Sequence, residues 1–451
     1  MRGSDLQGQH HSFDLPASSP SAFLSRTKRP AAFILLAATC AVLIATIHWK
    51  TLTTKSLEGF YYYDLAQKGP QQIEKPYANR FLHPLAVRLI SDVTHLDLDK
   101  SFYAMGCLSL LVFAIALAWL LDRLAGVPWL VVPLLLTAAS SQLISTFYHH
   151  DLFYATLLVL LFLTLWRKTG WVVSVLILLA LFLTRETTLL LSACIIGVAW
   201  FKAKRRIIAP VLAMSLLGSV ISAYVTRSSP ANVHKMGSLI YLALKVPFNF
   251  FENMLGVKVW LNTFVKVEPP IFTVVLPPWL HLGSITTVGL CPWLPIFPLT
   301  TAFMLFTFFG ISPLFLMFGL WKIRRPIARQ SSPLLLLTAS YGLLNFIISP
   351  LLGPHMSRLF GSGWPVFWLA VPVLVAKYFD LPRKSLLRLG ALHFLVSWIP
   401  FIIYSMNPES VPIVLSSVVL AFVFQVLAAK EIRKLSPADG AFEGNPSFEH
   451  A

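Results

Sequence analysis

The sequence predicts an all-α polytopic membrane protein, and two observations support this fold class. Of the 451 residues, 56% are hydrophobic and 12% are charged, and the mean hydropathy is +0.72. Soluble domains carry about 25% charged residues, so this composition excludes an ordinary soluble enzyme. Apolar runs close to the ~20 residues that a helix needs to cross a bilayer recur along the chain.

Apolar runs predict about twelve transmembrane helices. In chain order the runs are 31–48, 102–121, 129–148, 152–166, 171–183, 187–201, 207–225, 299–321, 334–349, 364–379, 389–405 and 411–429. Together they define a transmembrane domain over residues 31–434, between polar tails at 1–30 and 435–451 that are predicted to be disordered.

Basic residues indicate the orientation of these helices. Lys and Arg accumulate in cytoplasmic loops, and here they fall on every second connection. The groups are 26–29, 123, 167–168, 202–206, 322–329, 383–388 and 430–434. This alternation predicts that both termini are cytoplasmic. It also explains the net charge of +17 without invoking nucleic acid as a partner.

Two segments on the predicted outer side are too long for simple turns. The first is a long outer loop over residues 50–101. The second, 226–298, is rich in Pro and aromatic residues, and we expect short helices at 239–244 and 248–255 to lie in the membrane interface. A further pair of crossings in this second segment, which would give fourteen spans, is the alternative.

Ionisable residues beside the apolar runs are candidate functional residues, because charges are costly near a membrane interior. Those outside the basic groups all fall on the predicted outer side. They are Asp64, Arg80, His83, His149, His150, Asp151, Arg185, Glu186, His355 and Arg358. If the helices bundle, these residues can form one site.

Arg185 and Glu186 interrupt an otherwise apolar stretch over 171–200. Short helices that dip from the outer rim into a hydrated cavity explain this pattern. A plain hairpin turn with a solvated ion pair and one long tilted span are the alternatives. Guanidinium groups bind phosphate oxygens in a fork, so Arg80, Arg185 and Arg358 are candidate anion ligands. For each arginine, a structural salt bridge or a lipid-headgroup contact is the alternative.

Asp64 follows an aromatic run and is a candidate general base, since flanking rings partly desolvate the carboxylate. An interfacial aromatic belt with a capping acid is the alternative. His149 and His150 point about 100° apart on a helix, which disfavours a shared metal site. Hydrogen bonding to substrate by one histidine, oriented by Asp151, is favoured over binding of a divalent metal.

The sequence contains no Walker loop, dinucleotide-binding glycine turn, HExxH or GxSxG motif. The motifs typical of nucleotide hydrolysis, hydride transfer, zinc proteolysis and serine hydrolysis are therefore absent.

The order of the polar motifs resembles the GT-C superfamily of integral membrane glycosyltransferases, which use polyprenyl-phosphate sugars. It is most similar to a group of mostly uncharacterised bacterial GT-C-like proteins. The resemblance covers about residues 30–380 and rests on these motifs: Tyr62-Tyr63-x-Leu-Ala, Arg80-Phe-Leu-His-Pro-Leu, Asp151, Arg185-Glu186 and Arg358.

The resemblance implies an inverting transfer at the outer face of a bacterial inner membrane. Asp64 would activate the acceptor hydroxyl, and Arg358, with Arg185 or a histidine of 149–150, would neutralise the leaving lipid phosphate. The implied partners are a polyprenyl-phosphate sugar and a glycan, glycolipid or protein acceptor, with no cofactor firmly implied.

Two other functions stay open at the level of the sequence. One is a transporter or flippase for a lipid-linked or anionic substrate, and the other is a non-catalytic membrane protein that retains the fold. Transporters generally place polar sites near the bilayer midplane, between paired repeats. The one-sided placement of the charges here favours surface chemistry.

Overall fold

The computed structural model describes most of the predicted transmembrane domain. The described residues are 35–36, 39–40, 42–43, 57–74, 77–143, 147–167, 171–230, 238–262, 270–281, 285–322, 331–353 and 356–435. The first predicted span and both predicted tails therefore lie largely outside the described residues.

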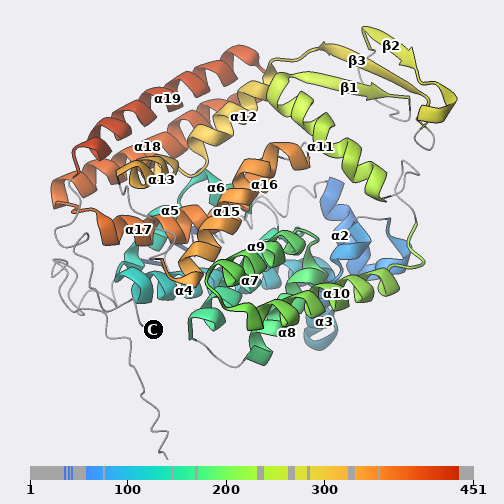
Figure 1. The fold of residues 1–451 in the computed structure, drawn as a ribbon, viewed down its shortest axis with the longest axis horizontal. Helices are drawn as coiled ribbons and strands as arrows, with labels where there is room; N and C mark the ends of the chain where they lie inside the picture. The colour runs from blue at the N-terminus through green and yellow to red at the C-terminus, as the bar shows by residue number, and fades with distance from the viewer. Residues whose placement is uncertain are drawn as a thin grey trace, which may run out of the picture.

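Helices dominate the described part of the chain (Figure 1). The α-helices are α2 (Leu57–Lys68), α3 (Leu82–Thr94), α4 (Leu98–Ala125), α5 (Val131–Leu135), α6 (Ala138–Leu143), α7 (Asp151–Arg167), α8 (Trp171–Thr184), α9 (Thr188–Phe201), α10 (Ile208–Val225), α11 (Ser238–Leu255), α12 (Ile296–Thr307), α13 (Ser312–Lys322), α15 (Pro333–Leu352), α16 (Met356–Gly361), α17 (Val371–Tyr378), α18 (Arg383–Met406) and α19 (Val411–Arg433). Short 3₁₀ turns are η2 (Pro70–Gln72), η3 (Tyr77–Arg80), η4 (Pro128–Leu130), η5 (Arg205–Ile207) and η6 (Pro278–Leu280), and η7 (Pro365–Ala370) is a π-helix.

The chain is a multi-pass helical membrane protein. Within the described residues, six helical stretches are long and apolar enough to cross a membrane, namely Leu98–Ala125, Arg205–Val225, Pro333–Leu352, Arg358–Tyr378, Lys384–Met406 and Val411–Arg433. The pair α12 and α13 adds a seventh crossing if it is counted as one span bent by 75°. The total of twelve spans stays a prediction.

The apolar run 129–148 does not form the single helix expected from its composition. It is divided among η4, α5 and α6 as far as residue 143. The hydroxyl of Thr137 donates to the carbonyl of Leu134, and that of Ser140 donates to the carbonyl of Leu135. These side chains satisfy carbonyls that a continuous helix would bond to its own backbone, and so they permit the turn.

At the bend between α12 and α13, buried polar side chains also form hydrogen bonds with backbone groups. The Gln425 amide donates to the carbonyls of Phe306 and Gly310. The N–H of Ile311 donates to Nδ1 of His393. Gly310 has a φ of 55°, a left-handed conformation that glycine adopts without strain. A polar break inside an apolar run is tolerated here because protein groups replace the missing backbone bonds.

Close helix packing brings α15 against η7. A Cβ atom built on Gly342 would lie 2.3 Å from the backbone nitrogen of Val366. Around this contact, Phe309 stacks on Phe367 with ring centroids 4.4 Å apart, and Trp364 is fully buried. Small residues let membrane helices approach closely, and dispersion between tightly packed groups then stabilises the bundle.

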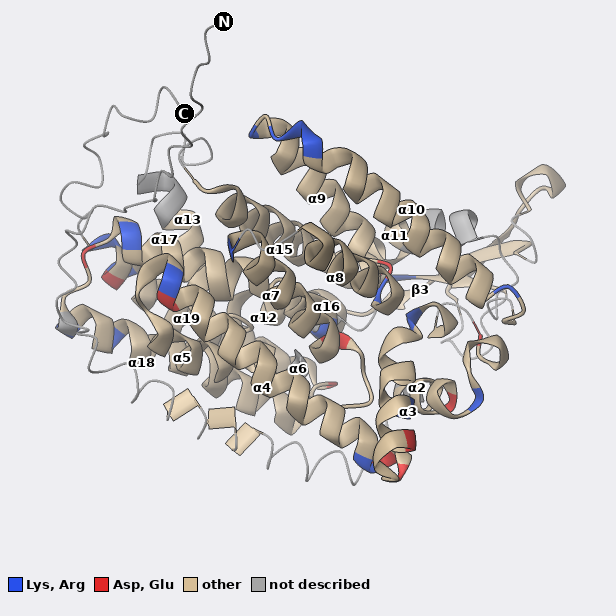
Figure 2. Ribbon diagram, turned by 90° about the horizontal axis from the view of Figure 1, so that it is seen from below, with Lys and Arg blue, Asp and Glu red and all other residues tan. Residues whose placement is uncertain are grey.

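Basic residues at the ends of neighbouring helices lie close together at two places. Arg123 and Arg167, from α4 and α7, both lie over the ring of Trp119, at 5.3 and 4.4 Å from its centroid. At another place Arg388 of α18 pairs with Glu431 of α19 at 3.7 Å. Figure 2 shows charged residues mainly at helix ends, with the long helices uncharged over most of their length. The side of the membrane on which these ends lie stays a prediction.

The segment 226–298 differs from the expectation of two short helices. The stretches 239–244 and 248–255 belong to one helix, α11, which continues through Pro247. A three-stranded antiparallel sheet then follows, with strands β1 (Val257–Leu261), β2 (Phe272–Val275) and β3 (Thr287–Trp293) in the order β1-β3-β2. The sheet projects from the bundle beyond the ends of α11 and α12 (Figure 1).

The register of this sheet is defined by its central strand. Gly289 of β3 pairs with Trp260 of β1 and with Thr273 of β2. A Cβ on Gly289 would lie 2.7 Å from the carbonyl oxygen of Phe272, so glycine is required for the close pairing of the strands.

Candidate functional site

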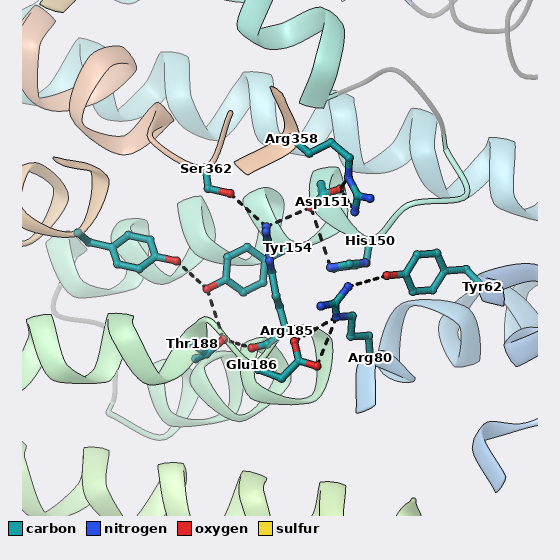
Figure 3. Close-up of polar contacts among 11 residues, drawn as sticks. Tyr62, Arg80, His150, Asp151, Tyr154, Arg185, Glu186, Thr188, Arg358 and Ser362 are labelled. Atoms are coloured by element: carbon teal, nitrogen blue, oxygen red, sulfur yellow. Dashed lines mark hydrogen bonds and ion pairs between the residues drawn. The ribbon is translucent and has the colours of Figure 1, made fainter. Parts of the chain in front are cut away.

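Asp151 is the first residue of α7 and is 3% exposed. Arg185 follows α8, which packs beside α7, and its Nη1 donates to Asp151 Oδ1 at 3.1 Å. Arg358 reaches the same carboxylate from α16, with Nε 2.8 Å and Nη2 2.7 Å from Oδ2. A carboxylate at a helix N-terminus is favoured by the helix dipole, and two guanidinium groups compensate its burial (Figure 3).

A second ion pair lies beside the first. Arg80, at the end of η3, donates from Nε to both carboxylate oxygens of Glu186, at 3.4 and 3.1 Å. Its Nη1 donates to the hydroxyl of Tyr62 at 3.0 Å, and Tyr62, from α2, is fully buried. This pair joins the first predicted outer segment to the turn between α8 and α9.

His150 lies between the two ion pairs. Its Nε2 is 4.0 Å from Asp151 Oδ1, and its ring meets that of Tyr62 edge-on with centroids 5.1 Å apart. Burial lowers the pKa of His150 well below its ordinary value, and the nearby guanidinium groups lower it further, against the effect of Asp151. His150 is therefore neutral near pH 7.

We call these side chains the arginine network, which consists of Tyr62, Arg80, His150, Asp151, Arg185, Glu186 and Arg358. Its three guanidinium groups face two carboxylates, so one positive charge is in excess. The side chains of Arg80 and Arg358 are 22% and 15% exposed, whereas that of Arg185 is 8% exposed. An anion that approaches the network therefore meets Arg80 and Arg358 first.

A second layer of hydroxyl groups fixes Arg185. Its Nη1 also donates to Ser362 Oγ at 3.1 Å, and its guanidinium lies 5.7 Å from the ring centroid of Tyr154. The Thr188 hydroxyl donates to the Arg185 carbonyl at 2.8 Å, and the Tyr154 and Tyr341 hydroxyls are 2.9 Å apart. Sequence reasoning missed these four residues. Tyr154 follows Asp151 by three residues, and Thr188 follows Arg185 by three residues. Side chains three residues apart are neighbours on a helix, so this spacing was the signal that could have identified Tyr154 and Thr188.

The turn at Arg185 and Glu186 separates two helices of 14 residues each. Each is about 21 Å long, which is shorter than the ~30 Å hydrocarbon core. One continuous span through 171–200 is therefore wrong. A solvated Arg185–Glu186 pair is also wrong, because Arg185 is 7% exposed and pairs with Asp151 instead.

The remaining candidate residues lie outside the arginine network or beside it. Asp64 pairs with Lys68 at 2.8 Å on a partly exposed face of α2, two residues from Tyr62. His83 is 1% exposed and its ring packs against Phe102 and Phe153. His149 meets the ring of Tyr62 edge-on. His355 lies outside the described residues.

Metal binding was an alternative role for the histidines and acids. In the part of the chain that the structure describes, no group of three or more His, Cys, Asp or Glu side chains is placed to hold a metal ion.

We expect the buried histidines to make the protein less stable in acid. Burial lowers the pKa of His83 from its ordinary 6.5 to about 3. Between these two values the unfolded chain binds a proton that the folded chain does not, so the free energy of unfolding falls as the pH falls, by about 1.4 kcal/mol per pH unit. Unfolding in detergent, measured across this range, should show a smaller pH dependence in His83→Phe. The exposed His95→Asn should keep the pH dependence of the parent protein. An equal slope in all three proteins would contradict a neutral, buried His83.

The fold and the site define a class, namely a helical membrane protein with a buried, positively charged network beside the N-terminus of α7. No protein-family model matches the chain, and neither does any curated protein or solved structure.

Proposed function

We propose that the protein is a membrane glycosyltransferase that moves a sugar from a polyprenyl-phosphate donor to an acceptor at the outer face of the membrane. The observation that supports this proposal is the convergence of Arg80, Arg185 and Arg358, from three separate segments, around Asp151 and Glu186, the two carboxylates with which they pair among the described residues. A phosphate monoanion or dianion complements the excess positive charge, and a guanidinium group binds its oxygens in a fork.

The transfer needs positive charge to neutralise the lipid phosphate of the sugar donor as it leaves. The acceptor hydroxyl attacks the anomeric carbon from the face opposite the lipid phosphate, and the bond between that carbon and the phosphate oxygen breaks. The phosphate leaves with the electron pair, and Arg358 and Arg80 stabilise its developing charge. Hydrogen-bond donors that are held in place before the reaction stabilise the charge of the transition state without having to reorganise, and so they lower the barrier.

The hydroxyl proton passes to a carboxylate in this scheme. Asp64 is the proton acceptor that the sequence predicts, and it lies two residues after Tyr62 of the arginine network, on another face of α2. Glu186 is the second candidate, because its side chain is 39% exposed and it already belongs to the network.

Arg358→Ala is expected to reduce turnover of a labelled polyprenyl-phosphate sugar by purified protein in detergent. A hydrogen bond to a charged group contributes about 1.5–3 kcal/mol, so kcat/KM should fall about tenfold to a hundredfold. Arg388→Ala is the matched control, because Arg388 also pairs with an acid but lies in α18. Equal turnover in both variants would remove Arg358 from the donor site. Movement of the lipid across sealed vesicles without sugar transfer would identify a transporter instead.

A further inference from the structure

The sheet carries an apolar surface that its own fold leaves uncovered. All four residues of β2 are exposed. We define the apolar sheet tip as the exposed residues Ile271, Phe272, Val274, Val275, Trp279 and Leu280. Trp279 is 81% exposed and Val275 is 73% exposed. An antiparallel sheet with one face in water alternates apolar and polar residues, whereas β2 presents apolar side chains on both faces. Contiguous apolar surface of this kind marks an interaction site.

The chemistry of the tip favours lipid over protein as its partner. Residues 270–281 contain no Asp, Glu, Lys or Arg. A typical protein interface surrounds its apolar centre with a polar rim, which this segment does not provide. Tryptophan is enriched where a membrane meets water, and Trp279 is the most exposed side chain of the tip. Trp293, at the other end of β3, is 65% exposed.

The sheet is joined by short connections to α11 and to the membrane-spanning pair α12 and α13. β1 begins two residues after α11, and α12, which belongs to the bent spanning pair, begins three residues after β3. Exposed apolar side chains also lie on α11, at Phe250, Phe251 and Met254. Trp293 Nε1 donates to the carbonyl of Leu255 at 2.8 Å and so fixes the sheet to the end of α11.

Hydrogen bonds place this unit at the end of the bundle that carries Arg358. Asn253 of α11 is 1% exposed, and its amide donates to the carbonyls of Pro350 and Gly353 at 2.7 and 3.3 Å. Asn249 donates to the carbonyl of Leu351 at 3.1 Å. These carbonyls end α15, directly before α16. β2 is an edge strand among the described residues, and deeper burial in hydrocarbon would require new partners for its outer backbone groups.

We propose that the apolar sheet tip lies in the boundary between headgroups and acyl chains of the same membrane and anchors this end of the bundle there. The proposal does not depend on the glycosyltransferase proposal, since a transporter or a non-catalytic protein would use the same anchor.

Site-directed spin labelling in liposomes tests the position of the tip. The label is attached at Val275→Cys in full-length protein whose four native cysteines are replaced by alanine, and collisions with oxygen and with a water-soluble nickel chelate are compared. Leu216→Cys, 68% exposed on the spanning helix α10, is the membrane reference. Lys100→Cys, with a side chain 71% exposed, is the water reference.

We expect the ratio of oxygen to nickel collisions at position 275 to lie above that at position 100 and below that at position 216, because the boundary is shallower than the middle of a spanning helix. A ratio equal to that at position 216 would place the tip in the hydrocarbon core and would contradict the proposal. A ratio like that at position 100 would overturn the proposal. A label shielded from both reagents would also overturn it, because it would indicate contact with protein. Ile271→Cys, at a position that is 70% exposed, provides a second label if Val275→Cys is poorly folded.

Discussion

Asp151→Asn is expected to lower the free energy of unfolding by about 3–5 kcal/mol, because it leaves buried guanidinium groups without their carboxylate. Arg185 and Arg358 both pair with Asp151, and their side chains are only 8% and 15% exposed. Ser362 would still accept a hydrogen bond from Arg185, but it carries no charge. Unfolding of purified protein in detergent, followed by circular dichroism, measures the effect.

Asp64→Asn is the matched control for this experiment. Its carboxylate pairs with Lys68 on an exposed face, with side chains 39% and 47% exposed, and such pairs contribute about 0–1 kcal/mol. A stable Asp64→Asn protein that no longer turns over the donor would support Asp64 as the proton acceptor. Full turnover in Asp64→Asn, with loss in Glu186→Gln, would assign that role to Glu186. Equal stability of Asp151→Asn and Asp64→Asn would contradict the buried double ion pair.

Gly342→Ala is expected to destabilise the bundle by about 1–3 kcal/mol or more, the usual range for overpacking. The added methyl group would lie 2.3 Å from the backbone nitrogen of Val366 and 2.9 Å from its Cβ. Because the nearest atom is backbone, no side-chain rotation relieves the clash, and α15 must separate from η7. A lower unfolding temperature in detergent and faster proteolysis are the measurements.

Gly197→Ala is the control for this substitution. Gly197 also lies in an apolar helix, α9, but nothing would lie within 4 Å of an added Cβ. The change should raise stability by up to about 1 kcal/mol, because alanine has the higher helix propensity. Similar stability of the two variants would mean that α15 and η7 are not packed as described.

The positions of single helices were largely predictable, because a long run of high hydropathy indicates a membrane-spanning helix. The runs 152–166, 207–225 and 411–429 correspond to α7, α10 and α19. The run 129–148 was not predictable in this way. Its composition is that of a span, while its structure depends on local bonds from Thr137 and Ser140 to backbone carbonyls. The strands were missed because short apolar runs fit either a buried strand or a helix.

The site was predictable in its residue types but not in its pairings. Charges in an apolar context identified Arg80, Asp151, Arg185 and Glu186 as unusual, and the structure brings them together. The sequence placed Arg185 beside Glu186, whereas each pairs with a residue from another segment. An interfacial belt was one of two interpretations of the tyrosines, and the sequence did not predict the bond from Arg80 to Tyr62, because it depends on how α2 packs.

The pairings also determine when each charge is compensated as the chain emerges from the ribosome. Asp151 and Arg185 are 34 residues apart, and Arg80 and Glu186 are 106 apart, so two neutral pairs are complete once α9 has been synthesised. Arg358 is 207 residues beyond Asp151 and arrives much later. Neutral pairs lower the penalty for inserting these early helices into lipid. The second guanidinium group on Asp151 therefore joins the assembly only when most of the surrounding helices have been synthesised.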